Sequence, residues 1–213
     1  MGKSSDTILS FPIRLAHETL GLSPNQISAV GFILGMAAAV LIVLGLLLPG
    51  LCVLAVSQVI DGLDGGVARK YNLLSEKGQI LEVIYDRLNE LAVFLALAFV
   101  GYVSLKMVAL AFMAILLVTI LEPMSKFDPG FKRFMIYFGY LLTAIVHVRG
   151  FEIAMQVIFF ANLCGFAAGT IMVDYRLQRE IDAQAIRRRE TEQAMNIPLP
   201  PDDPPSFLSK LFS

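Results

Sequence analysis

The chain has 213 residues, of which 56% are hydrophobic and 16% are charged, and its mean hydropathy is +0.70. This composition lies on the membrane-protein side of the averages for soluble globular proteins. With a formal net charge of -1 and no basic patch with interleaved aromatic residues, the sequence excludes a nucleic-acid partner.

The first 22 residues form a separate N-terminal segment. They lack the continuous apolar stretch of a removable signal peptide. Residues 7–20 combine apolar side chains with Arg14, His17 and Glu18. This pattern predicts an amphipathic helix that lies on the cytoplasmic surface of a membrane.

Residues 23–173 are predicted to form one transmembrane domain of an all-α protein. A bilayer core about 30 Å thick requires about 20 mostly apolar residues per helix. Pro49-Gly50 is a turn signal and predicts a tight antiparallel hairpin between the first two helices. Cys52 and Cys164 match no metal or redox spacing, so we expect small buried hydrophobic residues there. The six predicted transmembrane helices cover residues 26–48, 51–68, 78–103, 107–121, 134–148 and 153–173.

Residues 174–213 differ in composition from the apolar domain. The first part of this segment is charged and predicts a cytoplasmic helical extension of the last transmembrane helix. The remainder is rich in proline and predicts an extended tail.

The distribution of lysine and arginine predicts the orientation, because basic residues are retained on the cytoplasmic side of a membrane. Six spans place fifteen of them on one side and two, Lys106 and Arg149, on the other. We therefore expect an integral protein of the cytoplasmic (inner) membrane with both termini in the cytoplasm.

Acidic residues interrupt the second and third predicted helices. Asp61 and Asp64 are three residues apart, and Glu82 and Asp86 are four apart, so each pair shares a helix face. At a rise of 1.5 Å per residue, all four lie about 6 to 15 Å from the cytoplasmic helix ends. Carboxylates at that depth must be protonated, paired with cations or bound to metal, and oxygen ligands of this kind suit Mg²⁺, Mn²⁺ or Ca²⁺.

The spacing of these acids is similar to a known signature. Asp61-x2-Asp64-Gly65-x2-Ala68-Arg69-x8-Gly78-x3-Glu82-x3-Asp86 resembles D-x2-D-G-x2-A-R-x8-G-x3-D-x3-D of the CDP-alcohol phosphotransferase family. Glu82 is the one departure from it. The resemblance implies transfer of a substituted phosphate from a CDP-linked lipid, CDP-diacylglycerol or an analogue, to a small alcohol, with release of CMP. It also implies two Mg²⁺ or Mn²⁺ ions, a cytoplasmic active site and a homodimer.

Roles carried over from the family follow the positions of the motif. The resemblance implies that Asp86 is the general base, and that the metal ligands are Asp61, Asp64, Glu82 and Asp86. The CDP-binding residues that it implies are Asn25, Ser28, Gly65, Ala68, Arg69 and Gly78.

Further charged residues leave alternatives open. Lys126, Lys132 and Arg133 either bind the phosphate of an acceptor such as inositol phosphate or glycerol phosphate, or reflect the cytoplasmic bias of basic residues. Glu90 either extends the acidic face or pairs with Arg87. A divalent-cation transporter and a catalytically weakened membrane scaffold, the latter because of Glu82, are the alternatives to the enzyme.

Overall fold

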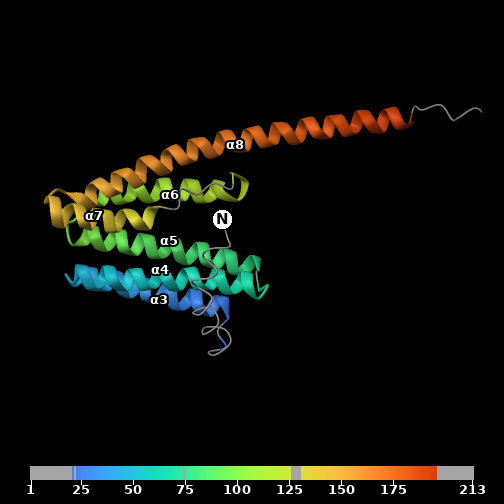
Figure 1. The fold of residues 1–213 in the computed structure, drawn as a ribbon. Helices are drawn as coiled ribbons and strands as arrows, with labels where there is room; N and C mark the ends of the chain where they lie inside the picture. The colour runs from blue at the N-terminus through green and yellow to red at the C-terminus, as the bar shows by residue number, and fades with distance from the viewer. Residues whose placement is uncertain (1–20, 22, 74, 126–130, 196–213) are drawn as a thin grey trace, which may run out of the picture.

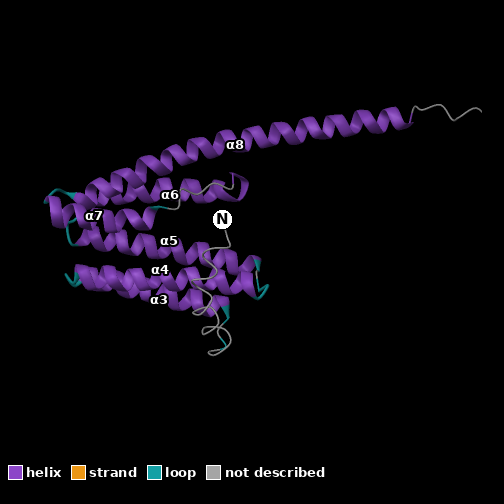
Figure 2. Cartoon of the chain, in the orientation of Figure 1, coloured by secondary structure: helices purple, strands orange, loops and turns teal. Residues whose placement is uncertain are grey.

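The computed structural model describes residues 21, 23–73, 75–125 and 131–195. Within these ranges the chain consists of helices and short loops, with no strand, which confirms the all-α prediction (Figures 1 and 2). The predicted amphipathic helix and the proline-rich tail lie outside the described residues. The described helices are α3 (Pro24–Val43), α4 (Leu47–Lys70), α5 (Glu76–Phe99), α6 (Leu105–Ser125), α7 (Lys132–Val146) and α8 (Gly150–Met195).

Four of these described helices, α3, α4, α6 and α8, are long and apolar enough to cross a membrane. The other two differ for separate reasons. α5 has 24 residues but carries the charged side chains of Glu82, Asp86, Arg87 and Glu90. α7 has only 15 residues, fewer than the usual length of a span. The prediction of six transmembrane helices therefore stays a prediction for α5 and α7.

The hairpin between α3 and α4 turns earlier than the sequence predicted. Gly45 has a φ of 80°, its N–H donates to the carbonyl of Ile42, and the Leu46 N–H donates to that of Leu41. This is a glycine-based helix C-cap. The prediction of a turn at Pro49-Gly50 is wrong, because Pro49 lies in the first turn of α4, where a missing N–H leaves no helical hydrogen bond unmade.

Small residues allow α3 to pack closely against both α4 and α5. Gly31 and Gly35 of α3 are buried, and the Ser57 hydroxyl of α4 donates to the Gly31 carbonyl at 2.8 Å. The Asn89 side chain of α5 lies directly against Gly35. Close approach through glycine is typical of helix packing in membranes. These contacts join α3 to the middle of both α4 and α5.

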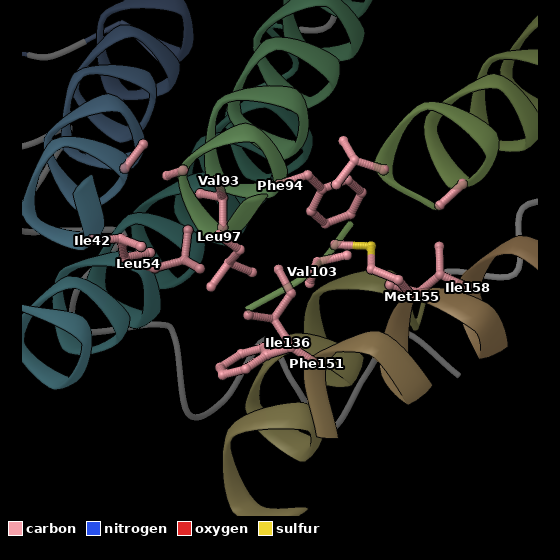
Figure 3. Packing of buried hydrophobic residues seen from close by; sticks show 14 of the residues in the cluster. Ile42, Leu54, Val93, Phe94, Leu97, Val103, Ile136, Phe151, Met155 and Ile158 are labelled. Atoms are coloured by element: carbon pink, nitrogen blue, oxygen red, sulfur yellow. The ribbon is translucent and has the colours of Figure 1, made fainter. Parts of the chain in front are cut away.

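The apolar core fills one end of the bundle. The buried cluster contains residues from all six described helices. Figure 3 shows part of it, including Phe94, Leu97 and Phe151, which are almost completely buried. The acidic residues of α4 and α5 lie one to three turns beyond this core, toward the other end. Packing thus closes one end of the bundle and leaves polar side chains at the other.

The last helix continues well past the other helices (Figure 1). Residues 174–191 of α8 are exposed, and the Arg176 guanidinium donates to the Met124 carbonyl at the end of α6, at 3.1 Å. The prediction that Cys52 and Cys164 are buried is wrong, because both thiols are free and exposed. In a membrane protein an apolar run also includes side chains that face lipid, so it does not by itself predict burial.

Candidate active site

Local sequence brings three helix ends together at the polar end of the bundle. Ser23 caps α3 in a reciprocal arrangement with Gln26, and Ser75 caps α5 by accepting a hydrogen bond from the Gly78 N–H at 3.0 Å. Between α4 and α5, Asn72 adopts the left-handed conformation, with φ 58°, that a tight helix exit requires. The start of α3, the end of α4 and the start of α5 therefore face one another.

A cavity of about 160 Å³ lies between these three helix ends. The structure brings all six of the predicted CDP-binding residues together around it, although they come from three helices. Asp64 and Glu82 also line the cavity. A side chain at Gly78 would lie 3.1 Å from Asn25 Oδ1, so the glycine keeps this wall open. The lining from the predicted CDP set is Asn25, Ser28, Gly65, Ala68, Arg69 and Gly78.

Asp64 is the most buried of the four motif acids, with 3% of its surface exposed. Both carboxylate oxygens accept hydrogen bonds: Oδ2 from the Ser28 hydroxyl and Oδ1 from the Gly65 N–H at 2.5 Å. Burying a carboxylate without such partners is costly. Ser28 therefore has a definite contact in the structure, to an acid of the motif.

Arg133 joins two other acids of the motif. Its Nη1 donates to Asp61 Oδ2 at 2.6 Å, and its Nη2 contacts Asp86 Oδ1. The sequence offered Arg133, Lys126 and Lys132 together as candidates to bind the phosphate of an acceptor. In the structure Lys132 is buried, Lys126 lies outside the described residues, and the guanidinium of Arg133 faces the acids. Only the folded arrangement of α7 reveals this pairing.

Glu90 adopts one of its two predicted arrangements. The Arg87 guanidinium lies 3.0 Å from the Glu90 carboxylate, which is buried, and 3.9 Å from that of Asp86. The acidic face of α5 is thus accompanied by a cation from its own helix as well as by Arg133 of α7. This arrangement reduces the cost of keeping several carboxylates within an apolar bundle.

A larger cleft of about 940 Å³ opens between α5 and α6. Glu82 and Asp86 line it together with apolar residues of α5 and with Thr119 and Glu122 of α6. Glu82 also lines the smaller cavity, so it lies between the two spaces. Glu82 is therefore the motif acid that borders both the small polar cavity and the wide cleft.

The fit of these acids to a metal ion depends on how they converge. Within the described part of the chain, no three His, Cys, Asp or Glu side chains lie close enough together to hold a metal ion. Asp61 and Asp86 nevertheless converge on one cation, the guanidinium of Arg133. Since carboxylate oxygens are the ligands that Mg²⁺ and Mn²⁺ prefer, the chemistry of these two converging side chains suits a hard divalent ion.

Comparison with known families agrees with the motif. The family model described as CDP-alcohol phosphatidyltransferase matches residues 21–131. The chain belongs to this family. The matched range includes α3, α4 and α5 with the whole of the small cavity, and it ends just before α7. With its four long apolar helices, the protein is an integral membrane member of the CDP-alcohol phosphatidyltransferase family.

Curated relatives match a part of this family member. Archaetidylinositol phosphate synthase from Pyrococcus horikoshii is 34% identical over 86 residues, which cover 40% of this chain and 45% of the relative. Phosphatidylinositol phosphate synthase from Mycobacterium marinum is 36% identical over 84 residues, covering 39% and 36%. The chain therefore matches less than half the length of these curated relatives.

Solved structures extend the likeness over most of the fold. A manganese and citrate complex of phosphatidylinositol phosphate synthase from Mycobacterium tuberculosis superposes with a TM-score of 0.64 and 18% identity, covering 76% of this chain and 87% of that one. A structure of the same enzyme with CDP-DAG bound gives a TM-score of 0.58 at 19% identity, covering 78% and 90%. The family member described here thus has the same fold as these proteins.

Proposed function

We propose that the protein is an enzyme that transfers a substituted phosphate from a CDP-linked lipid to a phosphorylated alcohol and releases CMP. One observation carries the proposal: Asp64 and Glu82 line the cavity formed by the predicted CDP-binding residues, and Glu82 and Asp86 line the wider cleft beside it. This arrangement suits in-line transfer, in which the acceptor hydroxyl attacks the phosphorus from the side opposite the departing CMP.

The donor is proposed to bind with its nucleotide in the smaller cavity. Gly65 and Gly78 carry no side chain there, which allows the diphosphate to approach the backbone. Arg69 supplies a positive charge beside it. The proposed donor is CDP-diacylglycerol or an analogue, and the apolar residues Ile80 and Ile84 in the cleft give its lipid part a compatible surface.

The proposed chemistry needs few protein groups. The acceptor hydroxyl attacks the lipid-linked phosphorus, a new O–P bond forms, and the P–O bond to CMP breaks. Asp86 accepts the hydroxyl proton, since it lines the cleft from which the acceptor approaches. Two divalent ions held by Asp61, Asp64, Glu82 and Asp86 would offset the charge on the diphosphate and on the departing CMP.

We propose inositol phosphate as the acceptor, with glycerol phosphate as the second candidate. Two curated relatives are named archaetidylinositol phosphate synthase and phosphatidylinositol phosphate synthase. A divalent-cation transporter is less compatible with the structure, because the apolar core closes the bundle beyond the acids. We also propose a homodimer with cytoplasmic termini and active site, as the family resemblance and the basic residues imply.

The test is CMP release by the purified protein from CDP-diacylglycerol, with Mg²⁺ or Mn²⁺ and a panel of acceptor alcohols. We expect release with inositol phosphate, and a loss of at least about 100-fold in Asp86→Asn, which keeps the shape but removes the base. Asp182→Asn on the exposed part of α8 makes the same chemical change away from the site and serves as the control.

Two results would contradict the proposal. Cation flux in liposomes without CMP release would favour the transporter. A folded protein that binds metal but releases no CMP with any acceptor would favour the weakened scaffold.

A further inference from the structure

The guanidinium of Arg133 occupies the carboxylates that the metal ions are proposed to use. One of its nitrogens contacts an oxygen of Asp61 and the other contacts an oxygen of Asp86. The exposed fractions of the three side chains lie between 21% and 27%, so ions from solution can reach the group. A single +1 charge therefore joins two acids from different helices.

The position of Arg133 on its helix makes this pairing electrostatically demanding. Arg133 is the second residue of α7, next to Lys132. The N-terminus of a helix carries a partial positive charge, which disfavours cations there. The two carboxylates offset both that field and the burial of the guanidinium. If another cation satisfied the carboxylates, the force that holds Arg133 inward would be lost.

Arg133 and a metal ion would compete for the space between these two acids. A divalent ion that bridges the two carboxylates binds their oxygens at about 2.1 Å, in the space between Asp61 and Asp86 where the Arg133 guanidinium now contacts one oxygen of each. Two cations so close together also repel each other strongly where water is scarce.

We propose that Arg133 is an internal counter-ion that a divalent metal ion displaces, so that guanidinium and metal are alternative partners of Asp61 and Asp86. This inference rests on the metal ligation in the proposed function. It implies that the apparent metal affinity is lower than that of the bare acids, because the metal must first displace Arg133. It also sets an order, since Arg133 becomes available to an anionic acceptor only after the metal has bound.

The first experiment follows Arg133 directly in the unaltered, full-length protein. Mn²⁺ binding is measured by calorimetry, and arginine modification by a dicarbonyl reagent is mapped by mass spectrometry with and without saturating MnCl₂. We expect modification of Arg133 to rise at least fivefold with Mn²⁺. Arg149, which is exposed at the opposite end of the bundle, should react equally in both conditions.

The second experiment uses charge-matched variants. Arg133→Gln should bind Mn²⁺ at least tenfold more tightly than the wild type, because the competitor is gone. Arg69→Gln removes the same charge beside Glu82 without touching Asp61 or Asp86, and should tighten binding less than threefold. Equal tightening in both variants would mean a general charge effect and would overturn the inference.

The outcomes also separate this inference from the proposed function. If calorimetry detects no Mn²⁺ binding, both the metal ligation and the displacement of Arg133 are wrong. If Mn²⁺ binds while modification of Arg133 stays constant or falls, only the displacement is wrong. The footprint is measured on the wild type, so it decides the question even if Arg133→Gln does not fold.

Discussion

Glu82 is the one motif residue whose chemical identity departs from the family signature, and its surroundings explain how the chain accommodates it. Glutamate has the charge of aspartate but is longer by one methylene, about 1.5 Å. Glu82 of α5 is exposed and lines both the small cavity and the cleft, whereas Asp64 of the neighbouring helix α4 is buried. A longer side chain fits at this open edge, where it would not fit at the position of Asp64.

This placement predicts the effect of shortening Glu82. We expect Glu82→Asp to keep CMP release within about tenfold of the wild type, because charge and donor atoms are retained. Glu82→Gln removes the charge at equal length, and we expect a loss of about 100-fold in activity or in metal affinity. Initial rates over a Mn²⁺ series measure both effects. A larger loss in Glu82→Asp than in Glu82→Gln would contradict this prediction, because it would show that length, rather than charge, governs this position.

At the scale of helices, the hairpin of α7 and α8 sets where Arg133 lies. Gly139 and Gly150 allow these two helices to touch: a Cβ at position 150 would collide with the Gly139 carbonyl and lie 2.6 Å from Leu142 Cβ and 2.7 Å from the Thr143 nitrogen. Two of these atoms belong to the backbone of α7, which moves only as a unit. The tilt of α7, and with it Arg133, therefore depends on Gly150.

A single added methyl group tests this contact. We expect Gly150→Ala to lower the free energy of unfolding by about 1 to 3 kcal/mol, the usual cost of overpacking. Gly62→Ala is the matched control, because it adds the same methyl group within a helix where nothing lies within 4 Å of it. Thermal unfolding in detergent compares the two. A Gly150→Ala protein as stable as the control would show that the hairpin can open without cost.

The helices also show what the sequence could predict. Apolar runs located all six described helices, and the motif acids lie within α4 and α5, where the sequence predicted helices. The chain carries two turn signals close together, Gly45 and Pro49-Gly50, and tertiary packing decides between them. Gly50 lies against Ile42 and the Ala38 carbonyl, so it is needed for packing within the hairpin rather than for the turn.

Contacts across the fold set the limit of prediction in the site. Arg133 lies 72 residues from Asp61 in sequence, and no local pattern links them. The six predicted CDP-binding residues, by contrast, come from three consecutive helices joined by short loops. The family resemblance, carried by residues close in sequence, therefore grouped the residues of the small cavity, but it did not predict the ion pairs of Arg133 with Asp61 and Asp86.

At the scale of the whole molecule, the two ends of the helix bundle carry different sets of residues. The acids, the small cavity and the exposed part of α8 lie at one end of the bundle, and Lys106 and Arg149 lie at the other (Figure 1). At that second end the Ser104 backbone N–H donates to the Glu152 carboxylate at 2.8 Å, which ties the α5–α6 loop to α8. Each end therefore has a residue suited to a test of sidedness.

Single cysteines at the two ends test the orientation in a membrane. Cys52 and Cys164 are free, so replacing both with alanine gives a cysteine-free background without loss of a disulfide. Into it we would introduce Gln178→Cys or Lys106→Cys, both exposed. In intact cells of a bacterial host, a membrane-impermeant maleimide should label position 106 and reach position 178 only after permeabilisation, because basic residues hold that end in the cytoplasm. Losing Lys106 reinforces this bias. Labelling of position 178 from outside would place the acids, and the proposed CDP site, on the wrong face for a cytoplasmic nucleotide.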